Sequence, residues 1–386
     1  MENQTNLNRG AGSEIPFTMR AVVYRGVNDL RLETVSVPET GAGELLVKIA
    51  TCGICGTDLK KIHLGSHSAP RIFGHEMAGT IVRVGAGVSN FKLGERVMVF
   101  HHVPCGVCYY CRKQTYAQCL TYKKVGSTAG YEPSGGGFAE YIRVSDWIVA
   151  NQGVVRIPDG VPFEQAAFIE PVNTVLKGVK LLNLQADETV LVIGQGPIGL
   201  MLAALARRTG ARVLTSDLYP ERHAIAAKFG LHEPIDARTE DVVARVKAIT
   251  EGRGADASIL AVGGSALIKT AMDAVRPGGK VMLFAQTQHG EAVIDPGAVC
   301  MDEKTLLGSY SSSFAILDEV TDLVFNGYRQ GFDLTQLISH RFPLEEAVEG
   351  VNIASHPQGD SMKIMIEPVP GAGAASNSMA GAGGTE

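Results

Sequence analysis

The chain has 386 residues, a length that favours two or three domains, and its hydrophobic fraction of 45% is sufficient for sizeable buried cores. A formal net charge of −5 leaves no basic footprint, so we expect no nucleic-acid partner. Its apolar runs fall short of the roughly 18 residues that a membrane-spanning helix needs, and the N-terminus carries no signal pattern, so we expect a cytoplasmic protein without a membrane partner.

Short strands dominate the first part of the chain. Runs rich in β-forming residues and bounded by Gly, Pro or Asn recur along it. They lie at Arg20–Tyr24, Glu44–Ile49, Met77–Gly85 and Gly94–Val99. This pattern predicts a small β-barrel-like domain over residues 18–174. Residues 1–17 and 370–386 have no periodicity, and we expect both segments to be disordered.

Two short motifs in this domain carry side chains that bind metals. Cys55–Asp58 and Gly74–Glu76 supply a thiol, an imidazole and two carboxylates, and a mostly polar loop separates them. Zinc prefers this borderline-soft mixture of sulfur, nitrogen and oxygen ligands. Glu170, in the later segment Phe168–Pro171, could complete the coordination shell. We therefore expect a catalytic zinc site here.

A second group of cysteines follows within the same domain. Its pattern is Cys105-x2-Cys108-x2-Cys111-x7-Cys119, which accounts for most of the seven cysteines of the chain. Four thiolates at this spacing close a tetrahedral zinc site without an open position, so this site is expected to be structural. Disulfides or buried free thiols are the alternatives, and the clustering favours zinc.

From Asp187 the pattern changes to that of a nucleotide-binding fold. The apolar run Thr189–Ile193 predicts a buried strand, and a glycine loop and a helix follow it. The loop is Gly194-Gln195-Gly196-Pro197-Ile198-Gly199. Because the loop lies between a strand and a helix, it predicts a pyrophosphate site at the helix N-terminus. The alternative is a tight turn without a ligand.

The next strand, Arg212–Asp217, ends in an acidic residue. A carboxylate at this point accepts hydrogen bonds from the adenosine ribose and repels a 2′-phosphate, so we expect NAD rather than NADP. Arg222 weakens this argument for NAD, because its side chain could contact a 2′-phosphate as well as a ribose. A strand-end aspartate that only caps a turn is the alternative for Asp217.

Strands and helices then alternate, which predicts a parallel, doubly wound sheet over residues 175–312. Its last strand, Thr305–Tyr310, is apolar and would leave unpaired backbone groups at the sheet edge. We therefore expect this edge to pair with a second copy in a homodimer. Residues 313–369 are expected to return to the first domain.

These motifs together resemble the zinc-dependent medium-chain dehydrogenases, which include alcohol, polyol and threonine dehydrogenases. The resemblance covers about residues 19 to 368. Its motifs are Cys55–Asp58, Gly74–Glu76, the four-cysteine lobe, Gly137–Tyr141, Glu170-Pro171 and Gly194–Gly199. The resemblance implies an α/β fold class, with a GroES-like β-barrel catalytic domain split in sequence by a Rossmann domain with a doubly wound parallel sheet. It also allows a homotetramer.

The resemblance assigns roles to individual residues. Cys55 and His75 would bind the catalytic zinc, and Glu76 and Glu170 would complete or flank its shell. Glu170 places the chain nearer the polyol and threonine branches, because alcohol dehydrogenases carry cysteine there. Thr57 would be the inner hydroxyl of a proton relay, and Thr174 matches a position near the nicotinamide, although a simple helix threonine is an equal alternative.

Two positions need a separate explanation. Many members carry a histidine at the outer end of the relay, where this chain has Lys60. Cys52 has no ligand counterpart, and a redox role for the Cys52–Cys55 pair lacks a thioredoxin-like context.

The expected reaction is hydride transfer between a secondary alcohol, polyol or sugar-like, and NAD to give a ketone, with one catalytic and one structural zinc per chain. A threonine-type dehydrogenase is the alternative within enzymes. A non-catalytic sensor of zinc and NADH, and a nucleic-acid module carried by the four-cysteine lobe, are the alternatives outside them.

Overall fold

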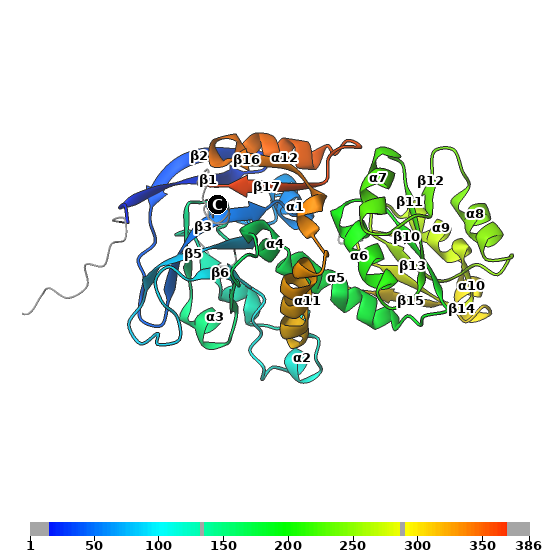
Figure 1. Ribbon diagram of the computed structural model, residues 1–386, viewed down its shortest axis with the longest axis horizontal. Helices are drawn as coiled ribbons and strands as arrows, with labels where there is room; N and C mark the ends of the chain where they lie inside the picture. The colour runs from blue at the N-terminus through cyan, green and yellow to red at the C-terminus, as the bar shows by residue number, and fades with distance from the viewer. Residues whose placement is uncertain (1–14, 132–134, 286–289, 369–386) are drawn as a thin grey trace, which may run out of the picture.

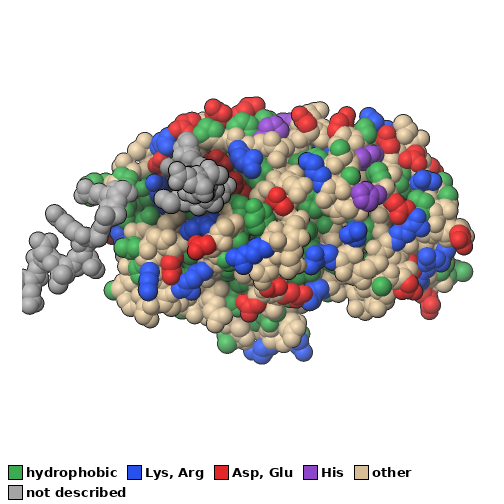
Figure 2. All heavy atoms as spheres, in the orientation of Figure 1, with side chains coloured by type: hydrophobic (Ala, Val, Ile, Leu, Met, Phe, Trp, Pro, Cys, Tyr) green, Lys and Arg blue, Asp and Glu red, His purple; other side chains and the backbone are tan. Residues whose placement is uncertain are grey.

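The computed structural model describes residues 15–131, 135–285 and 290–368. The first strand begins at Thr18, and most of the two terminal segments expected to be disordered lie outside the described residues. On the face seen in Figure 2, acidic and basic side chains are interspersed. Among the helices that the structure describes, none has the length and apolar character needed to cross a membrane.

The first half of the chain builds two mainly antiparallel sheets (Figure 1). The smaller has the order β2-β1-β4, and in the larger β3 pairs with both β5 and β8. The strands of this first half are β1 Thr18–Gly26, β2 Asp29–Ser36, β3 Leu45–Gly53, β4 Arg71–Ile72, β5 Glu76–Val84, β6 Arg96–Val99, β7 Ser127–Thr128, β8 Tyr141–Val144 and β9 Val154–Arg156. Its helices are α1 Gly56–Leu64, α2 Tyr109–Arg112, η1 Tyr116–Gln118, η2 Tyr122–Lys124, α3 Asp146–Ala150 and α4 Phe163–Ala167.

The second half is a six-stranded parallel sheet with the order β12-β11-β10-β13-β14-β15. Strand β10, Thr189–Ile193, is buried along its whole length because helices cover both faces of the sheet, which explains its continuous apolar sequence. The other strands are β11 Arg212–Asp217, β12 Pro234–Asp236, β13 Ala255–Leu260, β14 Val275–Leu283 and β15 Thr305–Gly308. The helices are α6 Pro197–Arg207, α7 Glu221–Lys228, α8 Val242–Ile249, α9 Ala266–Ala274 and α10 Pro296–Cys300.

The last segment returns to the first half, where Figure 1 shows β17 beside β3. Met365 and Ile366 of β17 pair with Gly53 and Cys52, which lie just before the motif Cys55–Asp58. The elements of this segment are η3 Phe314–Ile316, α11 Leu317–Arg329, η4 Leu334–Leu337, β16 Ile338–Pro343, η5 Leu344–Glu346, α12 Ala347–Ser355 and β17 Lys363–Glu367. The barrel-plus-parallel-sheet fold class predicted from the sequence is confirmed.

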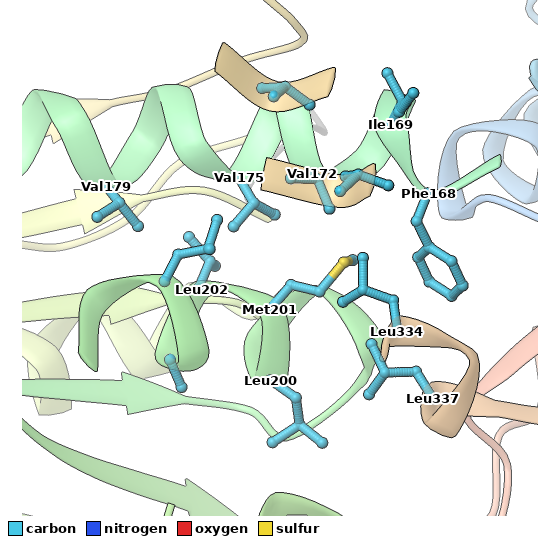
Figure 3. Packing of buried hydrophobic residues seen from close by; sticks show 14 of the residues in the cluster. Phe168, Ile169, Val172, Val175, Val179, Leu200, Met201, Leu202, Leu334 and Leu337 are labelled. Carbon is cyan, nitrogen blue, oxygen red and sulfur yellow. The ribbon is translucent and has the colours of Figure 1, made fainter. Parts of the chain in front are cut away.

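Helix α5, Ile169–Leu182, joins the two halves and runs without interruption through the boundary expected between residues 174 and 175. Its apolar face packs against α6 and η4 in one continuous core (Figure 3). Val172, Val175 and Met201 are among the contacting side chains, each at most 1% exposed. The packing of α5 therefore couples the glycine loop that opens α6 to the segment that carries Glu170.

The polar loop expected between Asp58 and Gly74 is wrong in its first part, because residues Gly56–Leu64 form helix α1. Cys55 is its N-cap, and its side chain and Asp58 form a reciprocal capping box. Gly65 ends the helix in the left-handed conformation, at φ 63°. These cap signals outweigh the low apolar content of the helix, which contributes mainly Ile62 to the core.

Candidate functional site

The N-terminus of α1 fixes Cys55 and its partner Asp58. Cys55 Sγ accepts a hydrogen bond from the Thr57 N–H at 3.5 Å, and the Cys55 N–H donates to Asp58 Oδ2 at 3.3 Å. Asp58 Oδ1 also lies 3.1 Å from His75 Nδ1, which is the hydrogen bond expected of a carboxylate that orients a metal-binding imidazole. The pair therefore leaves Nε2 as the ring nitrogen available to a metal.

Strand β5 brings two further donors to Cys55. His75 immediately precedes the strand and Glu76 begins it, and both side chains are buried. One potential ligand atom from each of Cys55, His75 and Glu76 lies within 4.8 Å of the others. A thiolate, an imidazole and a carboxylate that converge at a buried point fit zinc in both number and chemistry.

Burial alone would lower the pKa of His75, but the charges of Asp58 and Cys55 outweigh it and raise that pKa well above the ordinary value. The anionic surroundings of His75 thus favour a positive charge at this point. A bound cation would supply that charge and displace the proton.

Glu170 belongs to a neighbouring group instead of the same one. Its Oε1 accepts a hydrogen bond from Ser312 Oγ at 3.3 Å and lies 3.5 Å from His102 Nδ1. Ligand atoms of Glu170, His101 and His102 lie within 4.8 Å of one another. Burial raises the pKa of Glu170 to about 7, although the nearby His75 opposes this shift. The structure therefore brings Cys55, His75 and Glu76 together and places Glu170 beside them.

A cavity of about 550 Å³ lies over both groups. The barrel half lines it with Cys55, Thr57, His75 and Glu76, and α5 adds Glu170 and Thr174. Ile198, Ala261, Phe284 and Ala285 line it from the parallel-sheet half. The cavity thus exposes the candidate metal ligands and Ile198 of the glycine loop to one shared space.

Three basic side chains, Lys60, Lys61 and Arg71, also line the cavity. Burial lowers the pKa of Lys60, and the nearby Cys55 opposes this shift. Thr174 Oγ1 donates to Glu170 O at 3.3 Å and lies 3.2 Å from Ser312 Oγ. This threonine therefore belongs to the Glu170 network as well as to the cavity wall.

The four-cysteine group forms its own small lobe. Potential ligand atoms of Cys105, Cys108, Cys111 and Cys119 lie within 4.8 Å of one another. Cys111 and Cys119 are buried, and the four pack with Tyr122 in a cluster separate from the main cores. Free thiols held at this spacing fit a tetrahedral zinc ion, whereas no disulfide joins them.

The glycine loop has the shape that close approach of a ligand requires. A Cβ on Gly199 would lie 1.8 Å from the Gly194 carbonyl oxygen, so only glycine lets the loop turn back on the helix. A Cβ on Gly196, the N-cap of α6, would meet nothing within 4 Å. Pro197 occupies the first turn, where its missing N–H costs nothing. Open space over the free N–H groups of a helix fits a pyrophosphate.

Asp217 ends β11 beside this loop, and its carboxylate is already engaged. It accepts hydrogen bonds from the Gln195 N–H at 2.5 Å and the Tyr219 N–H at 2.9 Å, and it pairs with Arg222 at 3.3 Å. Arg222 also donates to the carbonyl groups of Gln358 and Ser361. Asp217 therefore stabilises the glycine loop whether or not a ribose binds. This role resembles that of an aspartate that caps a turn, which was the alternative considered for Asp217.

Three polar residues of this region were missed by the sequence reasoning. His101 and His102 follow β6, and a histidine pair at the end of a strand was the signal that could have identified them. His101 Nδ1 is buried without a hydrogen-bond partner among the described residues. Lys363, on β17, pairs with Glu76 Oε2. Its local sequence gave no signal, because a strand far along the chain brings it here.

Comparison with known proteins agrees with this geometry. Residues 41–159 match the family described as alcohol dehydrogenase GroES-like domain, and residues 197–326 match the zinc-binding dehydrogenase family. The chain is 29% identical over 368 residues to a sorbitol dehydrogenase of Bacillus subtilis, covering 92% of this chain and 98% of that protein. It is 31% identical over 359 residues to an L-threonine 3-dehydrogenase of Sinorhizobium medicae, covering 90% and 98%.

Solved structures show the same arrangement. A zinc-binding dehydrogenase of Sinorhizobium meliloti, solved with NADP bound, superposes with a TM-score of 0.79 at 30% identity. The superposition covers 91% of this chain and 99% of that one.

Proposed function

We propose a substrate and a reaction for this chain from the premise that it belongs to the zinc-dependent medium-chain dehydrogenase family. It oxidises a secondary hydroxyl group of a polyol or sugar-like substrate to a ketone and passes the hydride to NAD. The observation that carries this proposal is the shared cavity, which exposes Cys55, His75 and Glu76 to the same space as Ile198 beside the glycine loop.

Cys55, His75 and Glu76 are the residues that would hold the catalytic zinc, and Glu170 lines the same cavity. Zinc bound there would polarise a substrate hydroxyl and make its proton easier to remove. Thr57, exposed at the first turn of α1, receives or passes that proton, and the cavity wall holds the substrate against the nicotinamide. The cysteines of the separate lobe would hold a structural zinc.

NAD is the proposed cofactor, held by the N-terminus of α6 and by Asp217. The carboxylate of Asp217 still has lone pairs for ribose hydroxyls, and its charge would repel a 2′-phosphate. Arg222 could favour NADP by binding its 2′-phosphate, but only after breaking its contacts with Asp217 and with the two backbone carbonyl groups. One solved structure with this fold has NADP bound and another has NADH bound, so the fold accepts both cofactors and the choice depends on these side chains.

A threonine-type activity is the second candidate, and a specific observation favours it. Threonine carries a carboxylate beside its secondary alcohol, and the basic groups of Lys60, Lys61 and Arg71 line the cavity. A neutral polyol would instead form hydrogen bonds with the histidine and lysine side chains that line the same cavity. The relatives include both activities.

Two wider inferences accompany this function. Strand β15 is the edge of the parallel sheet, and its pairing with a second copy would give a homodimer. The cysteines are free thiols, and five of the seven are grouped as candidate metal ligands, which fits a reducing compartment such as the cytoplasm.

A substrate panel tests the proposed function. Purified enzyme is incubated with NAD or NADP and with polyols, sugars, simple alcohols or L-threonine, and NADH or NADPH formation is followed. His75→Ala should abolish turnover and retain NADH binding, since the glycine loop lies on the other half of the chain. His63→Ala is the matched control, because this exposed histidine on α1 contacts Asn28 and Ser355 instead of the cavity. Full turnover by His75→Ala would remove the proposed site.

A further inference from the structure

The cavity over the candidate metal ligands has two unlike walls. The parallel-sheet half contributes apolar side chains that include Ile198 and Phe284. The barrel half contributes three basic side chains, Lys60 and Lys61 from α1 and Arg71 from β4. A substrate that fills the space between these walls therefore meets positive charge on its barrel side.

Arg71 is the most buried of the three basic residues, with an exposed fraction of 8%. It belongs to the short strand β4, where it is paired with Tyr24 of β1. Burial lowers the pKa of Arg71, so its surroundings disfavour the charge that a guanidinium group nevertheless keeps at neutral pH. An anion beside Arg71 would offset this desolvation, and a guanidinium group binds a carboxylate or a phosphate through two parallel hydrogen bonds.

The two lysines extend the basic wall toward the metal motif. Lys60 is close enough to Cys55, and Lys61 to Asp58, for their charges to interact. Lys61 Nζ also lies 5.8 Å from the centroid of the Phe73 ring, in the segment that follows β4. An anionic group near the reacting carbon of a substrate would therefore meet these lysines as well.

The charge of the occupied cavity supports the same conclusion. Apart from histidines, the lining residues that the structure describes include three basic side chains and three that can be anionic. The anionic ones are Cys55, Glu76 and Glu170. They balance the basic side chains at most, so a divalent metal and the positively charged nicotinamide of NAD would leave an excess of positive charge. A cleft with an excess of one sign attracts substrates of the opposite charge.

We propose that Arg71, Lys60 and Lys61 form an anion subsite, and that the substrate is a polyol or sugar derivative that carries a carboxylate or a phosphate group. This inference rests on the proposed function, because it takes the cavity to bind the alcohol that is oxidised. The anionic group is unchanged in the reaction, in which the carbon that bears the hydroxyl supplies the hydride to NAD and the hydroxyl releases a proton. The relatives do not decide the charge of the substrate, because they are named for both sorbitol and L-threonine.

Substrates with carbon chains of equal length test the anion subsite. Sorbitol is neutral, gluconate carries a carboxylate and sorbitol 6-phosphate carries a phosphate. For the wild-type enzyme, kcat/KM should be about tenfold or more higher for one of the two anions than for sorbitol, and added salt should reduce this preference. The preferred anion then identifies the group that the subsite recognises. Equal or higher kcat/KM for sorbitol, or turnover of only simple alcohols or L-threonine, would overturn the proposal.

Arg71→Gln removes the guanidinium charge and keeps a polar side chain. It should lower the ratio of kcat/KM for the preferred anion to that for sorbitol by about 10–100-fold, as expected when hydrogen bonds to a charged group are lost. Calorimetric titration of the same anion into the complex of enzyme and NADH should show a similar loss of affinity without any turnover. Arg71→Lys should restore part of the preference, because it keeps the charge. Equal losses for the anion and for sorbitol in Arg71→Gln would overturn the recognition role.

Two further variants complete the test. Lys61→Gln serves if Arg71→Gln does not fold, since Lys61 is only partly buried on α1, and it should lower the same ratio. Arg96→Gln is the matched control, because burial also lowers the pKa of Arg96 but its side chain donates to the carbonyl groups of Pro158 and Val161, outside the cavity lining. Its ratio should equal that of the wild type. Failure of the proposed function would look different, because the wild-type enzyme would then oxidise no alcohol, whether neutral or anionic.

Discussion

Replacement of Asp217 by alanine tests whether this aspartate serves the fold, the cofactor or both. Its carboxylate accepts hydrogen bonds from the Gln195 and Tyr219 N–H groups and pairs with Arg222. The side chains of Asp217 and Arg222 are only 7% and 9% exposed. Truncation would therefore remove the charged partner of a buried guanidinium and the acceptor of the buried Gln195 N–H.

The expected cost follows from these contacts. Removal of one member of a buried ion pair typically costs about 3–5 kcal/mol. Arg222 would keep two carbonyl acceptors, at 3.1 Å on Gln358 and 3.3 Å on Ser361, so we expect a value near the lower end, about 3 kcal/mol. Urea unfolding of the cofactor-free protein measures this loss. Asp236→Ala, at the end of the adjacent strand, is the control, because its partner Arg238 is half exposed and the pair should contribute little.

The same variant should change cofactor preference. Without the carboxylate, NAD loses a ribose acceptor and a 2′-phosphate no longer meets a like charge, so the ratio of kcat/KM for NAD to that for NADP should fall. Arg222, released from its partner, would strengthen this change. Unfolding free energy within about 1 kcal/mol of wild type would refute the structural role, since removal of one partner of a buried ion pair typically costs about 3–5 kcal/mol. An unchanged cofactor ratio would refute the recognition role.

Three further predictions concern the metal sites and the proton route. Cys108→Ser should lose one zinc per chain by elemental analysis and lower the thermal midpoint, because binding of a structural metal is coupled to folding; unchanged zinc content would refute the assignment. Thr57→Ala should reduce kcat more than Lys60→Ala does, and equal losses with a shifted pH–rate profile for the lysine variant would show that Lys60 takes part. In the metal-free protein, burial raises the pKa of Glu170 from about 4.5 to about 7, so the folded state binds more protons than the unfolded state and stability falls as pH rises through this window. Glu170→Gln should therefore stabilise the metal-free protein at pH 8 relative to pH 5, and a pH-independent difference in urea unfolding would contradict this sign.

Local patterns in the sequence determined the two kinds of sheet and the glycine loop. The apolar run Thr189–Ile193 allowed only a strand buried on both faces, and the loop from Gly194 to Gly199 had to turn sharply into a helix. The four-cysteine site could also be predicted from spacing alone. Ligands a few residues apart in one lobe can come together without contacts from distant parts of the chain. Such features are set by steric limits and covalent reach, which the sequence records directly.

Tertiary structure decided how the expected ligands are grouped and which further side chains surround them. Local cap signals formed the helix Gly56–Leu64 where low apolar content suggested a loop, but only the fold brings Asp58 of this helix to His75. Burial and the network around Ser312 placed Glu170 with His102 instead of in the same group as Cys55.

Lys363 reaches Glu76 from far along the chain, because β17 pairs with β3. Its local sequence is that of an ordinary buried strand with a charged first residue. The charge balance of the site depends on such long-range pairing, in which the free energy of burying an ion is offset only by a partner that the fold supplies, so local sequence could not reveal it.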